Sequence, residues 1–381
     1  MPRRAFFTLV ALAALLHVYL GMRLLPPMLP GPGGLAVGIA LLVASSILVP
    51  TGLIASSLRR ARWTAALTWA ALLTMGLFSS LLVLTLLRDV LLLVLSVAGG
   101  AGADTLRRSA LAVPALALAV TALGLFNARR LARVVTVEVP IDGLPAALHG
   151  YTIVQISDIH VGPTIKGDFL HAIVERVNGL QGDAIAITGD LVDGSVAQLA
   201  EHTAPLARLS APDGVFFVTG NHEYYSGANA WIAELRRLGL TVLMNEHVLR
   251  ERQGAVLMIA GVADFTAHLF DASHRSDPRQ AAAGAPATVG ARILLAHQPR
   301  TALEAVDAGF HLQLSGHTHG GQFFPWNLFV PLQQPYVAGL RKLRSLWVYT
   351  SRGTGYWGPP KRFGAPSEIT RLRLVAAPAA Q

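Results

Sequence analysis

The spacing of hydrophobic residues changes near residue 133. Before it lie four long and almost uncharged apolar runs, at 6–25, 35–58, 64–87 and 109–127. Each run is long enough to cross about 30 Å of hydrocarbon, and none has the polar face of a soluble helix. The 11 residues 90–100 are too short to cross alone, so they extend the third helix to about 98 or lie at the interface. The pattern predicts a transmembrane region over 1–133 with four spans, or five.

Two alternatives to this interpretation concern the first run. Arg3 and Arg4 precede it, as in a cleavable signal peptide, but three more apolar runs follow, so we favour a membrane helix. His17 lies inside the run, where an isolated polar group can serve a function. We expect His17 to pack between helices instead.

From residue 134 onward, short β-branched strands are separated by helical stretches and turns. The predicted strands are 134–139, 151–157, 184–188, 214–219, 255–262, 292–297, 311–315, 346–351 and 368–375, and the predicted helices include 167–180 and 228–238. Strands that alternate with helices indicate an α/β domain. We place this domain at 134–375 and expect the Ala- and Pro-rich residues 376–381 to be a disordered tail.

The net charge of +9 is unevenly distributed along the 381 residues. Of the 31 basic and 22 acidic residues, the region 1–133 holds 12 arginines and two acids, so the remainder holds 19 and 20 and is nearly neutral. A surface that follows nucleic-acid phosphates should be basic on the domain that binds, so the charge does not indicate a nucleic-acid partner. The chain has no cysteine, and a metal would have to be held by His, Asn or carboxylate groups.

The arginines also predict how the helices are oriented. In a four-span arrangement one side holds Arg3, Arg4, Arg59, Arg60, Arg62, Arg129, Arg130 and Arg133. The opposite loop, 26–34, has no basic residue, although Arg107 and Arg108 also fall on that side. Because cytoplasmic loops are enriched in Arg and Lys, we expect both termini and the α/β domain in the cytoplasm. Five spans would reverse the placement of the domain.

Five predicted strands are each followed by residues of the type that binds metals. In chain order these residues are Asp158 with His160, Asp190, Asn221 with His222, His297, and His317 with His319. Ligands bind at the carboxyl ends of strands in open α/β sheets, so these side chains should converge on one edge. Residues i and i+2 of an extended chain point the same way, which would let Asp158 and His160 approach one centre or two neighbouring centres.

Each of these motifs has an ordinary structural explanation when it is taken alone. An Asp-x-His pair is usually a solvated turn, and Asp190 and Asn221 are of the type that caps helices. A single histidine at a strand end, such as His297, is more often hydrogen-bonded than a ligand, and Gly-His-Thr-His also suits a polar loop. Together these explanations would require five independent coincidences at the same strand end. We therefore favour a site for two metal ions.

The blocks Asp-x-His, Gly-Asp, Gly-Asn-His-Glu, a lone His and Gly-His-x-His resemble, in this order, the signature of the calcineurin-like metallophosphoesterase superfamily over 151–375. The resemblance implies a four-layer α/β/β/α sandwich after the transmembrane helices, and metal-dependent phosphoesterase activity. The stretch GHTHGGQ and residues 351–370 are similar to a membrane-associated bacterial branch, which includes UDP-diacylglucosamine diphosphatases and cell-envelope phosphoesterases. This similarity implies a multi-pass protein of the bacterial inner membrane.

The same resemblance implies a role for each site residue. The ligand sets are Asp158, His160 and His319 for one metal and Asn221, His297 and His317 for the other, with Asp190 as the bridge. Such ligands suit Mn, Fe or Zn, of which we favour Mn. His222 resembles the catalytic histidine that stabilises charge or protonates the leaving oxygen, and Glu223 would orient it. Two metals would activate a hydroxide for in-line attack without a covalent intermediate.

Aromatic and basic residues crowd the region 323–363, as they do at a membrane interface that binds anionic head groups. Arg362 in this region is a candidate to clamp a phosphate. We therefore favour a phosphohydrolase that cleaves a phosphoester or pyrophosphate bond of an amphiphilic or lipid-linked substrate. Its partner would be the lipid bilayer, with no nucleic-acid or protein partner expected. The alternatives are a phosphodiesterase acting on soluble nucleotides or nucleic acid, and a membrane sensor with a degenerate site, which the complete ligand set disfavours.

Overall fold

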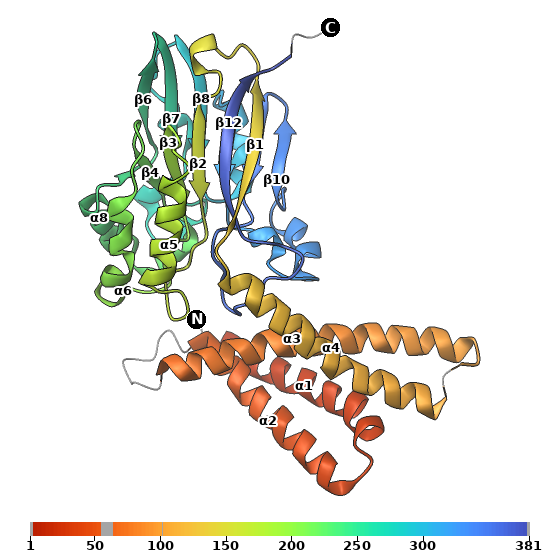
Figure 1. Ribbon diagram of the computed structural model, residues 1–381. Coiled ribbons are helices and arrows are strands. Elements are labelled where there is room, and N and C mark those ends of the chain that lie inside the picture. Colours follow the sequence, from red (N-terminus) through yellow and green to blue (C-terminus); the bar gives the residue numbers. More distant parts are fainter. Residues whose placement is uncertain (1–2, 55–63, 101, 379–381) are drawn as a thin grey trace. The chain divides into compact units, whose positions relative to one another are not determined.

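The computed structural model describes residues 3–54, 64–100 and 102–378, which form two compact units (Figure 1). The first, here called the helical unit, holds the N-terminal helices up to Arg129 together with Gly358–Phe363. The second, the α/β unit, holds Arg130–Trp357 and the chain from Gly364 onward. The domain that we predicted as contiguous over 134–375 is therefore interrupted by a segment that groups with the helices.

The described residues of the helical unit form four long helices, α1 (Arg3–Met28), α2 (Pro32–Ile54), α3 (Thr64–Val97) and α4 (Ala103–Arg129). All four are long and apolar enough to cross a membrane. Residues 90–97 continue α3, which was one of the two interpretations of that stretch. Helix α4 begins at Ala103, before the predicted start at 109. The apolar pattern missed the first turns because they are polar, with Arg108 paired to Asp104 one turn away at 2.8 Å.

Some predictions concern residues outside the described ranges. Arg59, Arg60 and Arg62, on which the predicted orientation depends, are among them, as are residues 379–381 of the predicted tail. The tail prediction was wrong at Ala376, because this residue ends the last strand.

His17 packs between helices of the helical unit, as expected. Its Nδ1 lies 2.7 Å from a carbonyl oxygen of its own helix, and its Nε2 lies 2.8 Å from Ser45 Oγ of α2. The imidazole also stacks on Phe78 of α3, with 4.2 Å between ring centroids. Both ring nitrogens are thus engaged in helix packing.

Gly358–Phe363 is held by α3 and α4. The buried Lys361 donates hydrogen bonds from Nζ to the carbonyl of Gly76 (3.0 Å) and to Ser80 Oγ. A Cβ atom at Gly124 would lie 2.6 Å from Lys361 Cγ, so the close approach of this segment to α4 requires glycine there. These contacts explain why the segment groups with the helices.

Two six-stranded sheets form the α/β unit. The first sheet has the order β1 (Arg133–Ile141), β12 (Glu368–Ala376), β2 (Thr152–Ile156), β3 (Ala184–Thr188), β4 (Val215–Val218) and β5 (Thr241–Val242). The second has the order β10 (Gly339–Leu343), β11 (Leu346–Thr350), β9 (Leu312–Ser315), β8 (Val289–Leu295), β7 (Ala255–Gly261) and β6 (Glu246–Arg252). All nine predicted strands are present. The strands that were not predicted, β5, β6 and β10, lie at sheet edges, where exposure weakens the apolar signal.

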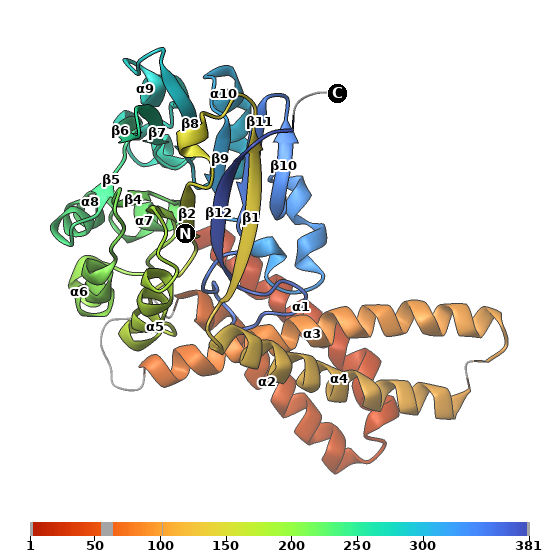
Figure 2. The same cartoon turned by 45° about the horizontal axis from the view of Figure 1, so that its top comes forward.

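Helices cover both sheets, so the unit has the four layers that were predicted (Figures 1 and 2). The helices are α5 (Gly167–Asn178), α6 (Val196–Thr203), α7 (Asn221–Ser226), α8 (Ala228–Arg237), α9 (Pro278–Ala282) and α10 (Ala302–Asp307). Residues such as Ile153 and Phe216 of the first sheet meet Ile293 and Leu314 of the second in one buried core. The outer face of the second sheet forms a separate core with α9 and α10. The two sheets thereby become a rigid support for the loops that follow their strands.

Candidate metal centre

The residues predicted as ligands follow the carboxyl ends of strands in both sheets. In the first sheet β2, β3 and β4 are parallel neighbours, and Asp158, Asp190 and Asn221 lie two or three residues beyond their ends. In the second sheet β8 and β9 are parallel, and His297 and His317 each lie two residues beyond the strand. Since the strands are buried in the core, the first polar residues after them emerge at one edge.

A left-handed backbone conformation orients most of these side chains. The φ angle is +53° at Asp158, +57° at His160, +51° at Asp190, +71° at His317 and +50° at His319. Non-glycine residues rarely adopt this conformation, which costs on the order of 1–3 kcal/mol each and is concentrated at functional sites. Tight turns, rather than the extended backbone expected from the sequence, therefore orient these side chains. Asp158 and His160 fall in one group of candidate ligands, whereas His317 and His319 fall in two different groups.

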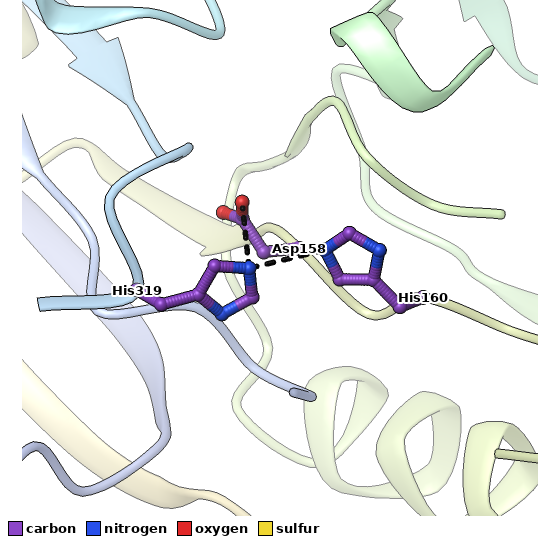
Figure 3. A group of neighbouring side chains, drawn as sticks. All are labelled: Asp158, His160 and His319. Atoms are coloured by element: carbon purple, nitrogen blue, oxygen red, sulfur yellow. Dashed lines mark hydrogen bonds and ion pairs between the residues drawn. The ribbon is translucent and has the colours of Figure 1, made fainter. Parts of the chain in front are cut away.

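Asp158, His160 and His319 form a first ligand group, shown in Figure 3. The Nε2 atoms of His160 and His319 lie 3.1 Å apart, and His319 Nε2 lies 3.5 Å from Asp158 Oδ1. His160 Nδ1–H donates to Asp193 Oδ1 at 3.1 Å, which directs the Nε2 lone pair of the neutral ring toward the other two residues. The three ligand atoms lie within 4.8 Å of one another, a spacing suited to one ion.

Asp190, His297 and His317 form a second group with the same spacing. His297 Nδ1–H donates to a backbone carbonyl at the end of β3 (2.8 Å). Its Nε2 therefore faces Asp190 Oδ2 at 3.1 Å and His317 Nδ1 at 3.2 Å. The buried Oδ1 of Asn221 has no hydrogen-bond partner within the described part of the chain.

These contacts fit divalent cations. Lone pairs of neutral imidazoles that face each other, or a carboxylate, repel unless a proton or a cation lies between them. A buried amide oxygen such as Asn221 Oδ1 carries a desolvation cost unless it is hydrogen-bonded or coordinates a metal. The combination of imidazole, carboxylate and amide groups suits Mn, Fe or Zn.

Burial and the carboxylates together set the charges of the second group. Burial, together with the neighbouring His297, lowers the pKa of His317 to about 3. Burial would also lower the pKa of His297, but the charge of Asp190 outweighs it and raises this pKa well above its usual value. Burial raises the pKa of Asp190, yet the nearby His297 and His222 hold it well below its usual value. Asp190 is therefore an ionised carboxylate at the centre of the site.

His222 lies beside both ligand groups. Its Nε2 is 3.9 Å from Asp190 Oδ2, and its ring makes an edge contact with the ring of His160, with 4.6 Å between centroids. His222 Nδ1–H donates to Asp193 Oδ1 at 2.6 Å. Burial would lower the pKa of His222, but the charge of Asp190 and the hydrogen bond to Asp193 raise it to about 9. The geometry thus places a proton donor next to the ligands.

Asp193, rather than the predicted Glu223, orients His222. The Glu223 carboxylate instead accepts hydrogen bonds from the backbone N–H groups of Gly220 (2.6 Å) and Asp190 (3.0 Å). A Glu at the third position of a helix, here α7, commonly turns back to the helix start, and this one also ties two ligand loops together. Asp193 was missed because, three residues after a ligand in the motif TGDLVD, it looks like any other loop acid.

Arg362, the predicted phosphate clamp, lies in the segment that groups with the helical unit. Its backbone N–H donates to the carbonyl of Gly124 (2.9 Å), and its carbonyl accepts from Asn127 Nδ2 (3.3 Å). Its side chain is buried. The predicted phosphate clamp stays a prediction.

Comparisons with known proteins agree with this site. A family model described as "Calcineurin-like phosphoesterase" matches residues 151–321, from the start of β2 to the glycines after His319. The chain is 42% identical over 290 residues to a "Transmembrane protein with metallophosphoesterase domain" of Bos taurus, covering 72% of this chain and 65% of the relative. A protein of the same description from Danio rerio is 40% identical over 274 residues, covering 69% of this chain and 62% of the relative.

The chain thus spans less than two thirds of the length of these two relatives. It matches a shorter relative more completely: an "Uncharacterized metallophosphoesterase" of Aquifex aeolicus is 34% identical over 224 residues, covering 58% of this chain and 84% of the relative. The family model falls on the strands that carry the candidate ligands, and the Aquifex relative is matched over most of its length, so the chain belongs to the calcineurin-like metallophosphoesterases.

Proposed function

We propose that the protein is a membrane-anchored phosphohydrolase with two divalent metals, Mn in preference to Fe or Zn. It cleaves a phosphoester or pyrophosphate bond of an amphiphilic or lipid-linked substrate, a class that includes UDP-linked acyl sugars such as UDP-diacylglucosamine. The observation that carries the two-metal part is the position of Asp190 Oδ2. This oxygen is 3.1 Å from His297 Nε2 and 4.0 Å from His160 Nε2, so one carboxylate reaches both ligand groups.

The residues of the site have separate roles in metal binding, orientation and proton donation. The proposed ligands are Asp158, His160 and His319 in one group, Asn221, His297 and His317 in the other, and Asp190 in both. When bound, the cations supply Lewis acidity to the phosphoryl oxygens and a water nucleophile of lowered pKa. Asp193 fixes the tautomers of His160 and His222 through one oxygen, at 3.1 and 2.6 Å. His222 Nε2, which faces Asp190, holds the proton that goes to the leaving oxygen.

The amphiphilic substrate is supported by the four helices in the same chain that are long and apolar enough to cross a membrane. We place the protein in a bacterial inner membrane as a multi-pass protein with the α/β unit on the cytoplasmic side. The support is the arginine-rich sequence on the side of Arg3, Arg4 and Arg129, against the uncharged loop 26–34.

The natural absence of cysteine allows a clean test of this orientation. A cysteine introduced at the exposed Pro30, between α1 and α2, should react with a membrane-impermeant maleimide added to intact cells. A cysteine at the exposed Ser210 of the α/β unit should react only after the membrane is opened. The unmodified chain is the control for background labelling, and the reverse pattern would place the α/β unit outside.

The catalytic assignment is tested on the full chain in detergent with Mn(II) and a chromogenic phosphodiester. We expect about two metal ions per chain. His222→Ala should keep this metal content and lose about 10²–10⁴-fold in turnover. Asp190→Asn should lose both metal and turnover. Normal turnover in His222→Ala, or an unchanged metal content in Asp190→Asn, would contradict the proposal. Phospholipids, lipid pyrophosphates and UDP-linked acyl sugars are then compared as substrates.

A further inference from the structure

Three large aromatic side chains of the α/β unit are exposed near His222. Tyr225 is 63% exposed, Phe270 54% and Trp357 50%. Other aromatic residues of this unit, such as Phe216 and Tyr349, are buried in its core. Exposed aromatic rings that cluster around a site, unlike single ones, indicate a binding surface for an apolar group.

The rings are in contact with His222 or with each other. Tyr225 makes an edge contact with the His222 ring, with 5.2 Å between centroids, and Trp357 makes another at 5.7 Å. Phe270 extends the surface by an edge contact with Tyr225 at 5.6 Å and a tilted contact with Tyr224 at 5.7 Å. The contacts thus run from Trp357 through His222 and Tyr225 to Phe270, so the proposed proton donor lies between exposed aromatic rings.

The backbone holds two of these rings in place. Tyr225 is three residues after His222 in α7, so the two side chains share a helix face. Trp357 is held by the side chain of Gln322. The backbone N–H of Trp357 donates to Gln322 Oε1 (2.9 Å), and the backbone carbonyl of Trp357 accepts from Gln322 Nε2 (2.8 Å). Gln322 is buried and directly follows the GHTHGG ligand motif. The position of Trp357 is therefore coupled to the metal centre.

We infer that Tyr225, Phe270 and Trp357 bind the leaving group of the substrate, and that this leaving group is a large apolar one. The inference rests on the proposed function, in which His222 protonates the leaving oxygen. Whatever is attached to that oxygen lies next to the neighbours of His222. Two of these, Asp190 and Asp193, belong to the metal centre, and the exposed ones are the rings of Tyr225 and Trp357. A flat ring and an acyl chain are both large and apolar, and the experiment below compares them.

The test measures binding separately from turnover. Three non-hydrolysable phosphinates are compared, with CH2 in place of the ester oxygen and methyl, octyl and 2-naphthyl groups on the leaving-group side, on the Mn-loaded full chain in detergent by calorimetry. They are called the methyl, octyl and naphthyl esters below, after the compounds that they mimic. The octyl or naphthyl ester should bind at least about tenfold more tightly than the methyl ester, because it buries apolar surface. Preference for octyl indicates an acyl chain, and preference for naphthyl indicates a planar ring.

Trp357→Ala and, independently, Tyr225→Ala should reduce this preference by about tenfold, the scale of one aromatic contact. Trp357→Phe should retain most of it. The matched control is Leu303→Ala, which should leave the preference intact. Leu303 is 61% exposed and lies on α10, a helix that covers the outer face of the second sheet. Metal content and circular dichroism of each variant show whether it is folded.

Equal binding of the three esters by the unmodified chain, or a preference that survives both alanine variants, would overturn the inference. Turnover of the corresponding phosphodiesters is measured in parallel. If the chain binds the apolar esters selectively but hydrolyses none of the diesters, the proposed function fails and the aromatic surface stands. If it hydrolyses all diesters at equal kcat/KM without selective binding, the aromatic surface fails and the proposed function stands.

Discussion

The helical unit and the α/β unit each bury a histidine, and the partners of the two rings differ. His17 has Nδ1 at 2.7 Å from a carbonyl of its own helix and Nε2 at 2.8 Å from Ser45 Oγ. His297 also has Nδ1 at 2.8 Å from a carbonyl, but its Nε2 faces Asp190 at 3.1 Å and His317 at 3.2 Å. The first ring is hydrogen-bonded on both sides, whereas the second directs one nitrogen at other ligand-type atoms.

This difference distinguishes a structural histidine from a candidate metal ligand, which burial alone does not, because both rings are buried. A neutral imidazole has one N–H and one lone pair, and in His17 both can be used by helix packing. In His297 the N–H is fixed by backbone, so the lone pair is available to a cation. The useful criterion is the partner of the second nitrogen.

The surfaces of the two units also differ in where their apolar side chains lie. Large apolar side chains such as Met22 and Val97 are exposed on the helical unit, whereas the apolar residues of the α/β unit lie mainly in its cores. In lipid, exposed apolar side chains contribute little to packing, so polar pairs and close helix contacts hold such a bundle together. Polar contacts in the helical unit are therefore expected to matter for stability and those in the α/β unit for chemistry.

The largest effect is expected for His297→Ala. Removing a ligand should lower turnover by more than about a hundredfold, because losing even a residue that only hydrogen-bonds to a metal ligand typically lowers activity by about 10–100-fold. Metal content should fall toward about one ion per chain, because the first ligand group is left intact. Metal analysis together with turnover of a chromogenic phosphodiester checks this. Full metal content with normal turnover would mean that His297 is as structural as His17.

An intermediate effect is expected for Asp193→Asn. An amide in place of this carboxylate weakens the orientation of His160 and His222, so turnover should fall by about 10–100-fold with a smaller loss of metal. The matched control is Asp213→Asn, which removes a carboxylate that accepts from Tyr151 at 2.6 Å beside the start of β4, at the opposite end of the strands from the ligands. Equal losses of turnover in the two variants would show that Asp193 acts only on stability.

The smallest effect on activity is expected for His17→Ala. Turnover should stay within about twofold, while the free energy of unfolding in detergent falls by about 1 kcal/mol, as for a typical lost hydrogen bond. Thermal unfolding measured beside phosphodiester turnover separates the two quantities. A tenfold loss of turnover without loss of stability would assign the helical unit a part in catalysis.

Much of the site was predictable because ligand identity resides in short motifs. Asp158, Asp190 and His297 follow apolar strands directly, so the strand pattern alone placed them at a sheet edge. The partner of His222 was not predictable. Glu223 is its neighbour in sequence, but the helix turns that carboxylate toward backbone N–H groups, and Asp193 arrives from the loop after β3.

By itself, the sequence determined the four apolar helices, the α/β order of the second unit and the identities of the candidate ligands, because period and side-chain chemistry are local properties. Only the tertiary structure decided that Gly358–Phe363 groups with the helices, that Asp190 reaches both ligand groups, and that Trp357 contacts His222. Each of these depends on which distant segments meet when the strands pair, and the distances between their atoms are set by the whole fold rather than by any one motif.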